Sequence, residues 1–556
     1  MKRILKSILS AAALVIPPAI IYGKTMPPSL TWEHFASDGG ELIAAIYTWG
    51  IPHPPGTPLF VFVGQLFRYL PFIADPALKM NIMSAFFALA TLGVTYKILR
   101  LLIGNKTLSV VATYFLAFGV TFWAQAIVAE VLTLNVFLVS LTTYFLLRWH
   151  VTVSHPQKYL HQAAFAYGLA LTNHTSSLCL IPAIAYLVGV TDHQEIINPK
   201  KAVRILAYTL LGLSPYLYIY LRAQATPQLN WGDPGTIARF FDHLTAKEYQ
   251  DFLFFKNWHL IIDNLFRALQ IFWSNFNPAG SALLLIALFF SKASGIKDFL
   301  VFSVCFQVAI NSNYNIFNIV TFYLPSLFFL TLLLGLGLKE SLPLLEAVAD
   351  KIRQKKDILF LNLKSFTVGP LTTKELNIRL DQAFSVVVGT LVIGLSFFNV
   401  IFHYQEVDIS QDREADNFGR QTFSVLDPGA IVITGTDRYT LGLMYYRYVV
   451  FPEREDVALV SNGTFLKNFW QISNLQNQYP NLKYPEVTPE TMAQEEKLAK
   501  ERLLEFIALN LPEHPVYLAE VYPPFNPNFA LRSVFEDKYV VESKGPIYKI
   551  IGEVEE

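Results

Sequence analysis

Three side chains near the start of the chain have types and spacing that could move a proton. Asp38 and Glu41 flank two glycines in Ser37-Asp-Gly-Gly-Glu41, and His53 lies among prolines in Ile51-Pro-His-Pro-Pro-Gly-Thr-Pro58. A carboxylate held at a helix start could accept a proton from an acceptor hydroxyl. The same Asp38–Glu41 spacing also suits a capping box that only ends a helix. His53, with its backbone fixed by prolines, could equally be a hydrogen-bonded structural residue.

Other polar residues stand at the ends of later apolar segments. They are Glu130, Asn173, His174, Arg222, Trp231, Asp233 and Tyr314. Arg222 could hold a phosphate as a fixed cation, or it could be a snorkelling side chain. Three of these positions could also have purely structural roles. Glu130 could be a solvated carboxylate at a helix end, and Asn173 and His174 could form a hydrogen bond between helices. Trp231 could be an anchor at the membrane interface.

The composition identifies the medium in which these residues must be positioned. The chain has 556 residues, of which 53% are hydrophobic and only 15% charged, and the mean hydropathy is +0.38. A soluble chain of this length usually carries about 25% charged residues. Lys and Arg together number 43, as do Asp and Glu, so no basic excess exists that would bind nucleic acid. A polytopic protein of the lipid bilayer is therefore predicted.

A helix needs about 20 apolar residues to cross a bilayer, and the sequence contains about eleven such segments. We expect spans at 7–23, 80–103, 107–126, 131–148, 161–175, 176–190, 203–221, 278–291, 297–312, 319–338 and 381–403. The pair within 161–190 could also form a single span. Residues 59–73 and 259–276 are interrupted and are expected to be interfacial or re-entrant helices. Cys179 and Cys305 lie inside apolar segments, so no disulfide is expected.

The distribution of positive charge orients these spans. Loops on the N-terminal side hold about 20 Lys and Arg, against about 8 in the opposite loops, which predicts a cytoplasmic N-terminus. An odd number of spans then places residues 404–556 outside the cell, after a membrane domain of residues 1–403. All the polar candidates above fall on this outer side, and the first outer loop, about 24–79, is the richest in them. Ionisable groups at such positions are functional candidates.

The last 150 or so residues change character. Apolar strand segments are expected at 430–435, 456–460 and 514–520, and helical segments at 440–449 and 489–510. Alternation of strand and helix predicts a small extracytoplasmic α/β domain. The fold class is thus mainly α, a transmembrane helical bundle with a small α/β domain. Neither a glycine-rich phosphate loop nor a clear internal repeat is evident in the sequence.

Several of these segments, in this order, resemble a widespread bacterial membrane family. The matching strings are Asp38-Gly-Gly-Glu41, His53-Pro-Pro-Gly-Thr-Pro-Leu59, Ala129-Glu-Val131, Asn173-His174, Pro215-Tyr-Leu-Tyr-Ile-Tyr-Leu-Arg222, Asn230-Trp-Gly-Asp-Pro234 and Asn313-Tyr-Asn-Ile316. The family, long of unknown function, includes the eukaryotic transmembrane protein O-mannosyltransferase that acts on IPT domains. It is similar to the GT-C glycosyltransferases, polytopic enzymes that use polyprenyl-phosphate sugars on the non-cytoplasmic face. Family members often have a Tyr-Asp-Ile-Asp-like stretch where this chain has Asn313–Asn318.

The resemblance implies a GT-C-like fold and transfer of a sugar, such as mannose, from a polyprenyl-phosphate donor to a hydroxyl of a protein or glycan. It implies Asp38 as the base and Glu41 as a second acidic group. Arg222 and His174 are then candidates for the departing phosphate, and His53 and Glu130 for the sugar site. No cofactor is implied; a divalent metal remains an open alternative for which the sequence offers no cluster of ligands. We expect the protein in a bacterial plasma membrane.

Two other classes remain open from the sequence. A transporter or flippase of lipid-linked sugars should place its polar residues near the middle of the membrane, often with inverted repeats. A non-catalytic scaffold that presents the C-terminal domain would leave the acidic group of the first outer loop with capping as its only role.

Overall fold

The length of the apolar helices determines the membrane part of the fold. The computed structural model describes residues 2–253, 257–341, 343, 394, 397–461, 469–486, 498–519 and 538–554. Within these residues, six helices are long and apolar enough to cross a bilayer. They are α4 (Pro76–Ile103), α7 (Leu132–Val151), the pair η2–α9 (Thr175–Asp192), α14 (Trp258–Phe290), α15 from Gly295 to Ser312, and the helix Ile319–Ser341.

Two bent helix pairs raise the number of candidate spans to eight in the described part of the chain. In the first pair, α5 (Lys106–Ala117) and α6 (Val120–Ala126) meet at 72°. In the second, α11 (Pro199–Gly212) is followed at 44° by Ser214–Ala223, which contains α12 (Leu217–Ala223). Polar backbone groups at such breaks are tolerated where protein rather than lipid surrounds them.

The count of eleven spans differs from the structure for identifiable reasons. In α1 (Lys2–Thr25), the side chains of residues 2–11 lie outside the described part of the chain, and the remaining Ala12–Thr25 is shorter than a span. The helix α8 (Gln157–Asn173) has 17 residues. Most of the expected span 381–403 lies outside the described residues. The expected helix 259–276 and the expected span 278–291 are the two parts of α14, which joins two helices across a kink at Asn277. The backbone departs from helical geometry inside α14 only at Asn277.

The structure shows which secondary structure two ambiguous segments adopt. Residues 161–190 form two helices, because α8 ends at Asn173 and His174 is extended. The apolar stretch 59–73 contains α3 (Pro58–Phe67), a helix of 10 residues that is too short to span a bilayer.

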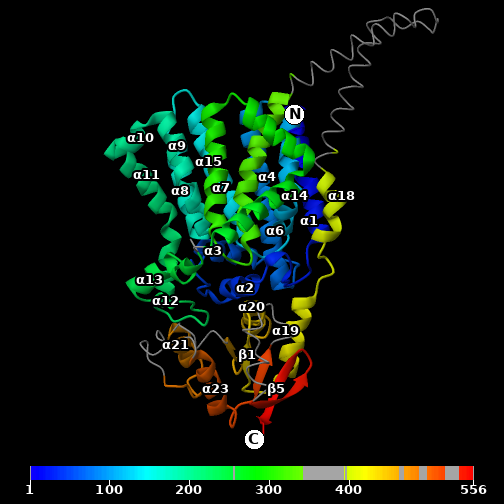
Figure 1. The fold of residues 1–556 in the computed structure, drawn as a ribbon, viewed down its shortest axis with the longest axis vertical. Coiled ribbons are helices and arrows are strands. Elements are labelled where there is room, and N and C mark those ends of the chain that lie inside the picture. Colours follow the sequence, from blue (N-terminus) through cyan, green and yellow to red (C-terminus); the bar gives the residue numbers. More distant parts are fainter. Residues whose placement is uncertain are drawn as a thin grey trace, which may run out of the picture.

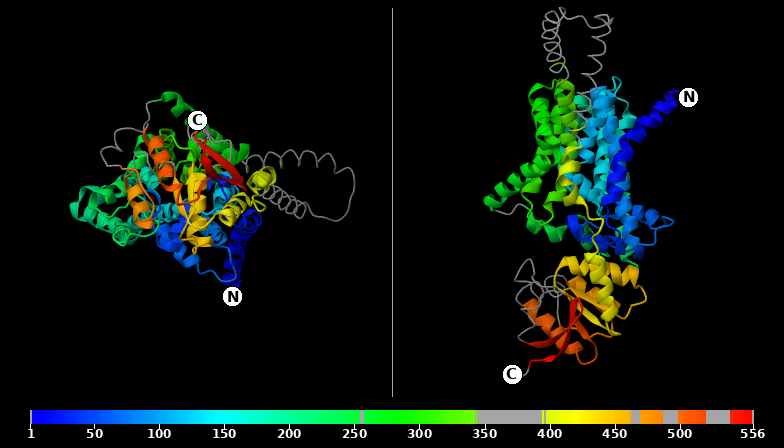
Figure 2. Two further views of the ribbon diagram at one scale, coloured as in Figure 1. Left: turned by 90° about the horizontal axis from the view of Figure 1, so that it is seen from below. Right: turned by 90° about the vertical axis from the view of Figure 1, so that its right-hand side faces the viewer.

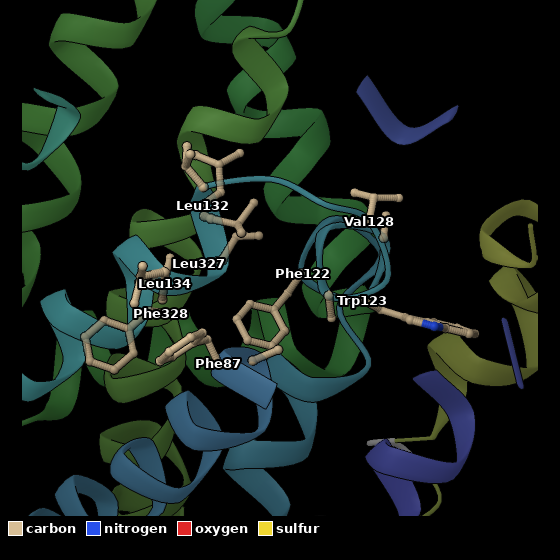
Figure 3. Close-up of a cluster of buried hydrophobic side chains, with 14 of the residues drawn as sticks. Phe87, Phe122, Trp123, Val128, Leu132, Leu134, Leu327 and Phe328 are labelled. Atoms are coloured by element: carbon tan, nitrogen blue, oxygen red, sulfur yellow. The ribbon is translucent and has the colours of Figure 1, made fainter. Parts of the chain in front are cut away.

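The centre of the bundle is filled by large apolar side chains from helices far apart in sequence. Figure 3 shows Phe87 of α4, Phe122 of α6, Leu134 of α7 and Phe328 meeting in one cluster, and all are buried. Polar side chains connect the helices around this cluster. The Trp123 indole donates to the Thr25 hydroxyl at 2.9 Å, which fixes the end of α1 against α6.

The C-terminal domain is a five-stranded mixed sheet with helices around it. The strand order is β2-β1-β3-β5-β4, with β1 parallel to both neighbours and the β4–β5 pair antiparallel. The strands are β1 (Ile431–Thr434), β2 (Ala458–Ser461), β3 (Val516–Ala519), β4 (Tyr539–Lys544) and β5 (Ile547–Glu553). The helices are α19 (Glu414–Val425), α20 (Asp437–Tyr445), α21 (Phe469–Gln478) and α23 (Leu498–Asn510). This arrangement confirms a small α/β domain.

The C-terminal domain lies at one end of the bundle, opposite the N-terminal end of α1 (Figures 1 and 2). A layer of short helices stands between the two parts, and the chain enters the domain through α18 (Phe398–Val407) and α19. The layer contains α2 (Gly39–Thr48), α12 and α13 (Ile237–Leu244). The polar candidates of the first outer loop are carried by this layer.

Candidate functional site

Two carboxylates and an imidazole meet at the start of α2. The Glu41 carboxylate accepts from the His53 backbone N–H at 2.7 Å, and its other oxygen lies 2.5 Å from His53 Nδ1. On the far side of the ring, His53 Nε2 is 4.0 Å from the Asp38 carboxylate. Glu41 is completely buried, whereas the side chains of His53 and Asp38 are 22% and 26% exposed. His53 therefore connects a buried acid to one that solvent or substrate can reach.

The geometry argues against the capping-box alternative. Asp38 occupies the position before α2, but its side chain accepts no hydrogen bond from the helix start. Glu41, which would have to reach back in a capping box, is instead bonded to His53. By contrast, Asp75 caps α4 with a bond of 2.8 Å from Leu78 N–H. The Asp38 carboxylate is thus mounted on a helix start without being used to cap it.

Electrostatics favour the charged form of His53. Burial by itself lowers the pKa of His53, but the Glu41 carboxylate, with smaller contributions from Asp38 and Glu130, raises it to about 10. Burial also raises the pKa of Glu41, an effect that His53 opposes. The charged form of His53, stabilised by Glu41, therefore places a cation beside Asp38.

Glu130 approaches the same group from the loop between α6 and α7. Burial raises its pKa well above the usual range, Asp38 raises it further and His53 lowers it. One of its oxygens, Oε1, is buried without a hydrogen-bond partner in the described structure. Such an atom is costly unless a ligand or water satisfies it. Three predicted residues, Asp38, Glu41 and His53, are therefore brought together, and Glu130 joins them.

A wall of aromatic side chains stands beside His53. The Trp231 ring lies 6.0 Å from the His53 ring, and the Tyr249 ring lies 6.3 Å from it. Trp231 is positioned because Ile51 donates to Leu229 O at 2.8 Å and Trp231 N–H donates to Ile51 O at 3.1 Å. Sequence reasoning identified Trp231 but missed Tyr249, which had no motif to distinguish it among 27 tyrosines.

The C-terminal domain contributes to this wall. The indole N–H groups of Trp231 and of Trp470 in α21 both donate to the Glu248 carboxylate, at 3.1 and 3.2 Å. The two indole rings are 5.6 Å apart. Asn474, one turn further along α21, donates to Asn230 O at 2.6 Å. The position of Trp231 beside His53 is thus supported from both domains.

A second contact brings α20 onto α2. A Cβ atom on Gly40 would stand 2.2 Å from the carbonyl oxygen of Leu441, so only glycine permits this approach. Trp32 packs beside it, with the Tyr439 ring 5.4 Å away and the Arg438 guanidinium 4.4 Å from its centre. This contact places Asp437, the first residue of α20, near the acidic group, and sequence reasoning missed it.

Other predicted residues have visible structural partners. Arg222 donates to the carbonyls of Trp49 and Thr48, at 2.7 and 3.3 Å, at the end of α2. Asp233 is paired with Arg239 at 2.6 Å and accepts from Asn230 at 3.0 Å, within its own turn. These bonds position α2 and the Trp231 turn, and the phosphate role of Arg222 stays a prediction.

Asn173, His174 and Tyr314 form the opposite flank. Asn173 donates to Val131 O at 2.8 Å and so holds the Glu130 loop. The rings of His174 and Tyr314 both contact Phe322, at 4.8 and 5.8 Å. An electrostatic interaction also joins His174 to His53. Among the described residues, no group of three or more His, Cys, Asp or Glu has the geometry to hold a metal ion.

Comparison with known families agrees with this geometry. Residues 38–197 match the family model described as the N-terminal domain of protein O-mannosyl-transferase TMEM260. The matched region begins at Asp38 and includes every flanking residue up to His174. It ends before Trp231, Tyr249 and the C-terminal domain.

Two curated relatives carry the same description. The protein O-mannosyl-transferase tmem260 of Dictyostelium discoideum is 24% identical over 599 residues, which cover 99% of this chain and 68% of the relative. The TMEM260 protein of Mus musculus is 26% identical over 246 residues, which cover 44% of this chain and 34% of the relative. The chain thus spans about two-thirds of one relative and a third of the other. These matches confirm the resemblance identified from the sequence.

Solved structures match the fold along the whole chain. ArnT from Cupriavidus metallidurans, bound to undecaprenyl phosphate, aligns with a TM-score of 0.55 at 13% identity, covering 98% of each chain. The apo form of the same protein also gives a TM-score of 0.55, at 12% identity, covering 99% of this chain and 98% of ArnT. This likeness confirms the predicted membrane bundle with its C-terminal domain as an ArnT-like arrangement.

Proposed function

We propose that this membrane glycosyltransferase, a GT-C-like relative of the TMEM260 O-mannosyl-transferases, transfers a sugar from a polyprenyl-phosphate donor to an acceptor hydroxyl with Asp38 as the base. The observation that carries the proposal is the Asp38 carboxylate. It is partly exposed, does not cap its helix, and faces a His53 ring that is fixed by buried Glu41. The names of the relatives make mannose the first sugar to test.

The proposed chemistry needs little from the protein beyond a base and correct positioning. The acceptor oxygen forms a bond to the anomeric carbon of the sugar as the bond from that carbon to the phosphate oxygen breaks. The electron pair of the broken bond leaves with the polyprenyl phosphate, and the acceptor proton passes to Asp38. The His53 ring, whose Nε2 is 4.0 Å from the Asp38 carboxylate, lies beside the atoms that exchange this proton.

The donor class has support from structure and from the residues. One of the matching ArnT structures binds undecaprenyl phosphate, a polyprenyl phosphate. In this chain α2, which carries Glu41 and begins directly after Asp38, lies at the end of the bundle that faces the C-terminal domain (Figure 1). A lipid carrier can remain in the bilayer there while its sugar reaches Asp38. We propose that this end is the extracytoplasmic one, as the charge distribution of the loops predicts.

The test is donor consumption by the full chain in bilayer nanodiscs with a panel of radiolabelled polyprenyl-phosphate sugars. Loss of a general base typically lowers the rate by about 10²–10⁴-fold, so Asp38→Asn should reduce turnover by that factor and remain folded. Asp75→Asn is the matched control, because Asp75 is a true helix cap and asparagine also caps well.

The outcomes separate the competing functions. Turnover that survives in Asp38→Asn would contradict the assignment of the base while retaining the enzyme. A wild-type protein that consumes none of the donors but moves them between leaflets would favour the flippase alternative. That alternative predicts polar residues at mid-membrane, whereas the described acidic group lies at one end of the bundle.

A further inference from the structure

We propose that the C-terminal domain supplies Asp437 as a second carboxylate for the acceptor, facing Asp38 across the contact between the two domains. The inference rests on the proposed function and deepens it, because it assigns a site residue to a domain whose role the family match does not cover. It makes the site a composite of two domains that are about 400 residues apart in the sequence.

The position of Asp437 follows from the packing of α20. Leu441, one helical turn after Asp437, has its carbonyl against Gly40, two residues after Asp38. The start of α2 therefore lies against the middle of α20, one helical turn from Asp437. Next to Asp437, the Arg438 guanidinium is paired with Glu414 at 2.7 Å and covers the Trp32 ring. Arg438 is therefore engaged on the side of Trp32 and Glu414.

The electrostatic environment connects Asp437 to the acidic group. Asp437 is exposed to solvent at this contact. Partial desolvation by the surrounding atoms raises the pKa of its carboxyl, and Asp38 raises it further, whereas His53 lowers it. Tyr249 also interacts with Asp437, Asp38 and Glu41. Two like charges held near each other cost stability, which is typical of a functional site and unfavourable for a purely structural one.

A second observation points to a ligand in this place. The Oε1 atom of Glu130, which belongs to a residue only 5% exposed, has no hydrogen-bond partner in the described structure. The charge of Asp38 raises the pKa of both Asp437 and Glu130 beyond the effect of desolvation, so all three carboxyl groups share one electrostatic environment. Hydroxyl groups of an acceptor can donate to these oxygens.

The negative charge of these carboxylates suits the acceptor rather than the phosphate of the donor. The phosphate of the donor is an anion and is repelled by carboxylates, so it belongs on the side away from Asp437. A hydroxyl-bearing acceptor is neutral and donates hydrogen bonds to carboxylates, which are charge-assisted and strong. Asp437 is thus placed to orient the acceptor while Asp38 takes the proton.

The first experiment measures whether Asp437 faces Asp38, independently of activity. Thermal unfolding is compared for the wild type, Asp38→Asn, Asp437→Asn and the double variant. Because either change removes the same repulsion between the two carboxylates, the Tm shift of the double variant should be lower than the sum of the two single shifts. Additive shifts would overturn the inference. The control for loss of charge is Glu542→Gln, because Glu542 is exposed on β4 and is paired there with Lys544.

The second experiment measures transfer by the full chain in nanodiscs, with polyprenyl-phosphate mannose as donor and a synthetic threonine peptide or water as acceptor. Loss of a charge-assisted bond should raise the KM for the peptide about tenfold in Asp437→Asn, with the KM for donor unchanged. Asp437→Glu should restore part of the loss. An unchanged peptide KM, or an equal change in Glu542→Gln, would overturn the inference. A wild type that consumes no donor would count against the proposed function, and the unfolding cycle would still decide the position of Asp437.

Discussion

Substituting Gly40 by alanine tests whether the site depends on the contact between α2 and α20. The new Cβ would stand 2.2 Å from Leu441 O and 2.8 Å from Leu441 C, whereas ordinary contacts begin at 3.4 Å. The two helices must therefore separate by roughly 1 Å, and forced separation of this kind costs about 1–3 kcal/mol. That cost corresponds to a shift of roughly 5–150-fold toward a form in which α20 has left α2.

The assay has two parts. Donor turnover in nanodiscs should fall in Gly40→Ala by a similar factor, because Asp437 and the Trp470 wall move with α20. Hydrogen exchange at α20 should become faster. The change gains helix propensity of about 1 kcal/mol in α2, so loss of helix cannot be the cause of lower activity. Gly93→Ala in α4 is the matched control, since nothing lies within 4 Å of its new Cβ.

One result would refute this reasoning. If Gly40→Ala keeps wild-type turnover and wild-type exchange at α20, the contact between α2 and α20 is either absent in solution or irrelevant to the site. If exchange becomes faster but turnover is unchanged, the contact exists and the site does not need the C-terminal domain.

Three further predictions concern neighbouring residues. Glu41 raises the pKa of His53 from an ordinary 6.5 to about 10, so the charged ring stabilises the fold fully below pH 6.5 and this contribution should disappear between pH 6.5 and 10. Glu41→Gln should flatten that part of a plot of unfolding free energy against pH. Gly56→Ala should cost about 2 kcal/mol or more in chemical denaturation, because φ is +83° and the Cβ would stand 2.7 Å from Nε2 of buried His243. Arg222→Gln should lower Tm more than it changes the donor KM, because Arg222 caps α2 through the Trp49 carbonyl; a large rise in donor KM with an unchanged Tm would favour phosphate binding instead.

Most membrane-spanning helices could be predicted from hydropathy, because it depends only on residues that are adjacent in the sequence. The expected spans 80–103 and 131–148 correspond to α4 and α7 with boundaries within a few residues. The expected boundary between 259–276 and 278–291 corresponds to the kink of α14 at Asn277. Pro278 follows directly and is a local signal that interrupts a helix.

Only those site residues that lie close together in the first outer loop could be predicted from the sequence. Asp38, Glu41 and His53 lie within 16 residues and carry their own motif. Asp437 and Trp470 become site residues through contacts that span the whole chain, and a single sequence contains no signal for such pairing. One hint was present: Asp437 follows the parallel strand β1, and the carboxyl ends of parallel strands commonly carry functional groups.

The bond of two indoles to one carboxylate has a consequence for the biosynthesis of the protein. Trp231 and Glu248 are synthesised more than 200 residues before Trp470, which completes their arrangement. During translation the membrane helices and the Asp38 loop are inserted first, and they must wait for the last fifth of the chain to fold beside them. A nascent chain therefore exposes an incomplete acidic group that lacks Asp437. Under the role proposed for Asp437, such a chain binds its acceptor weakly, and full activity begins only after the C-terminal domain has folded.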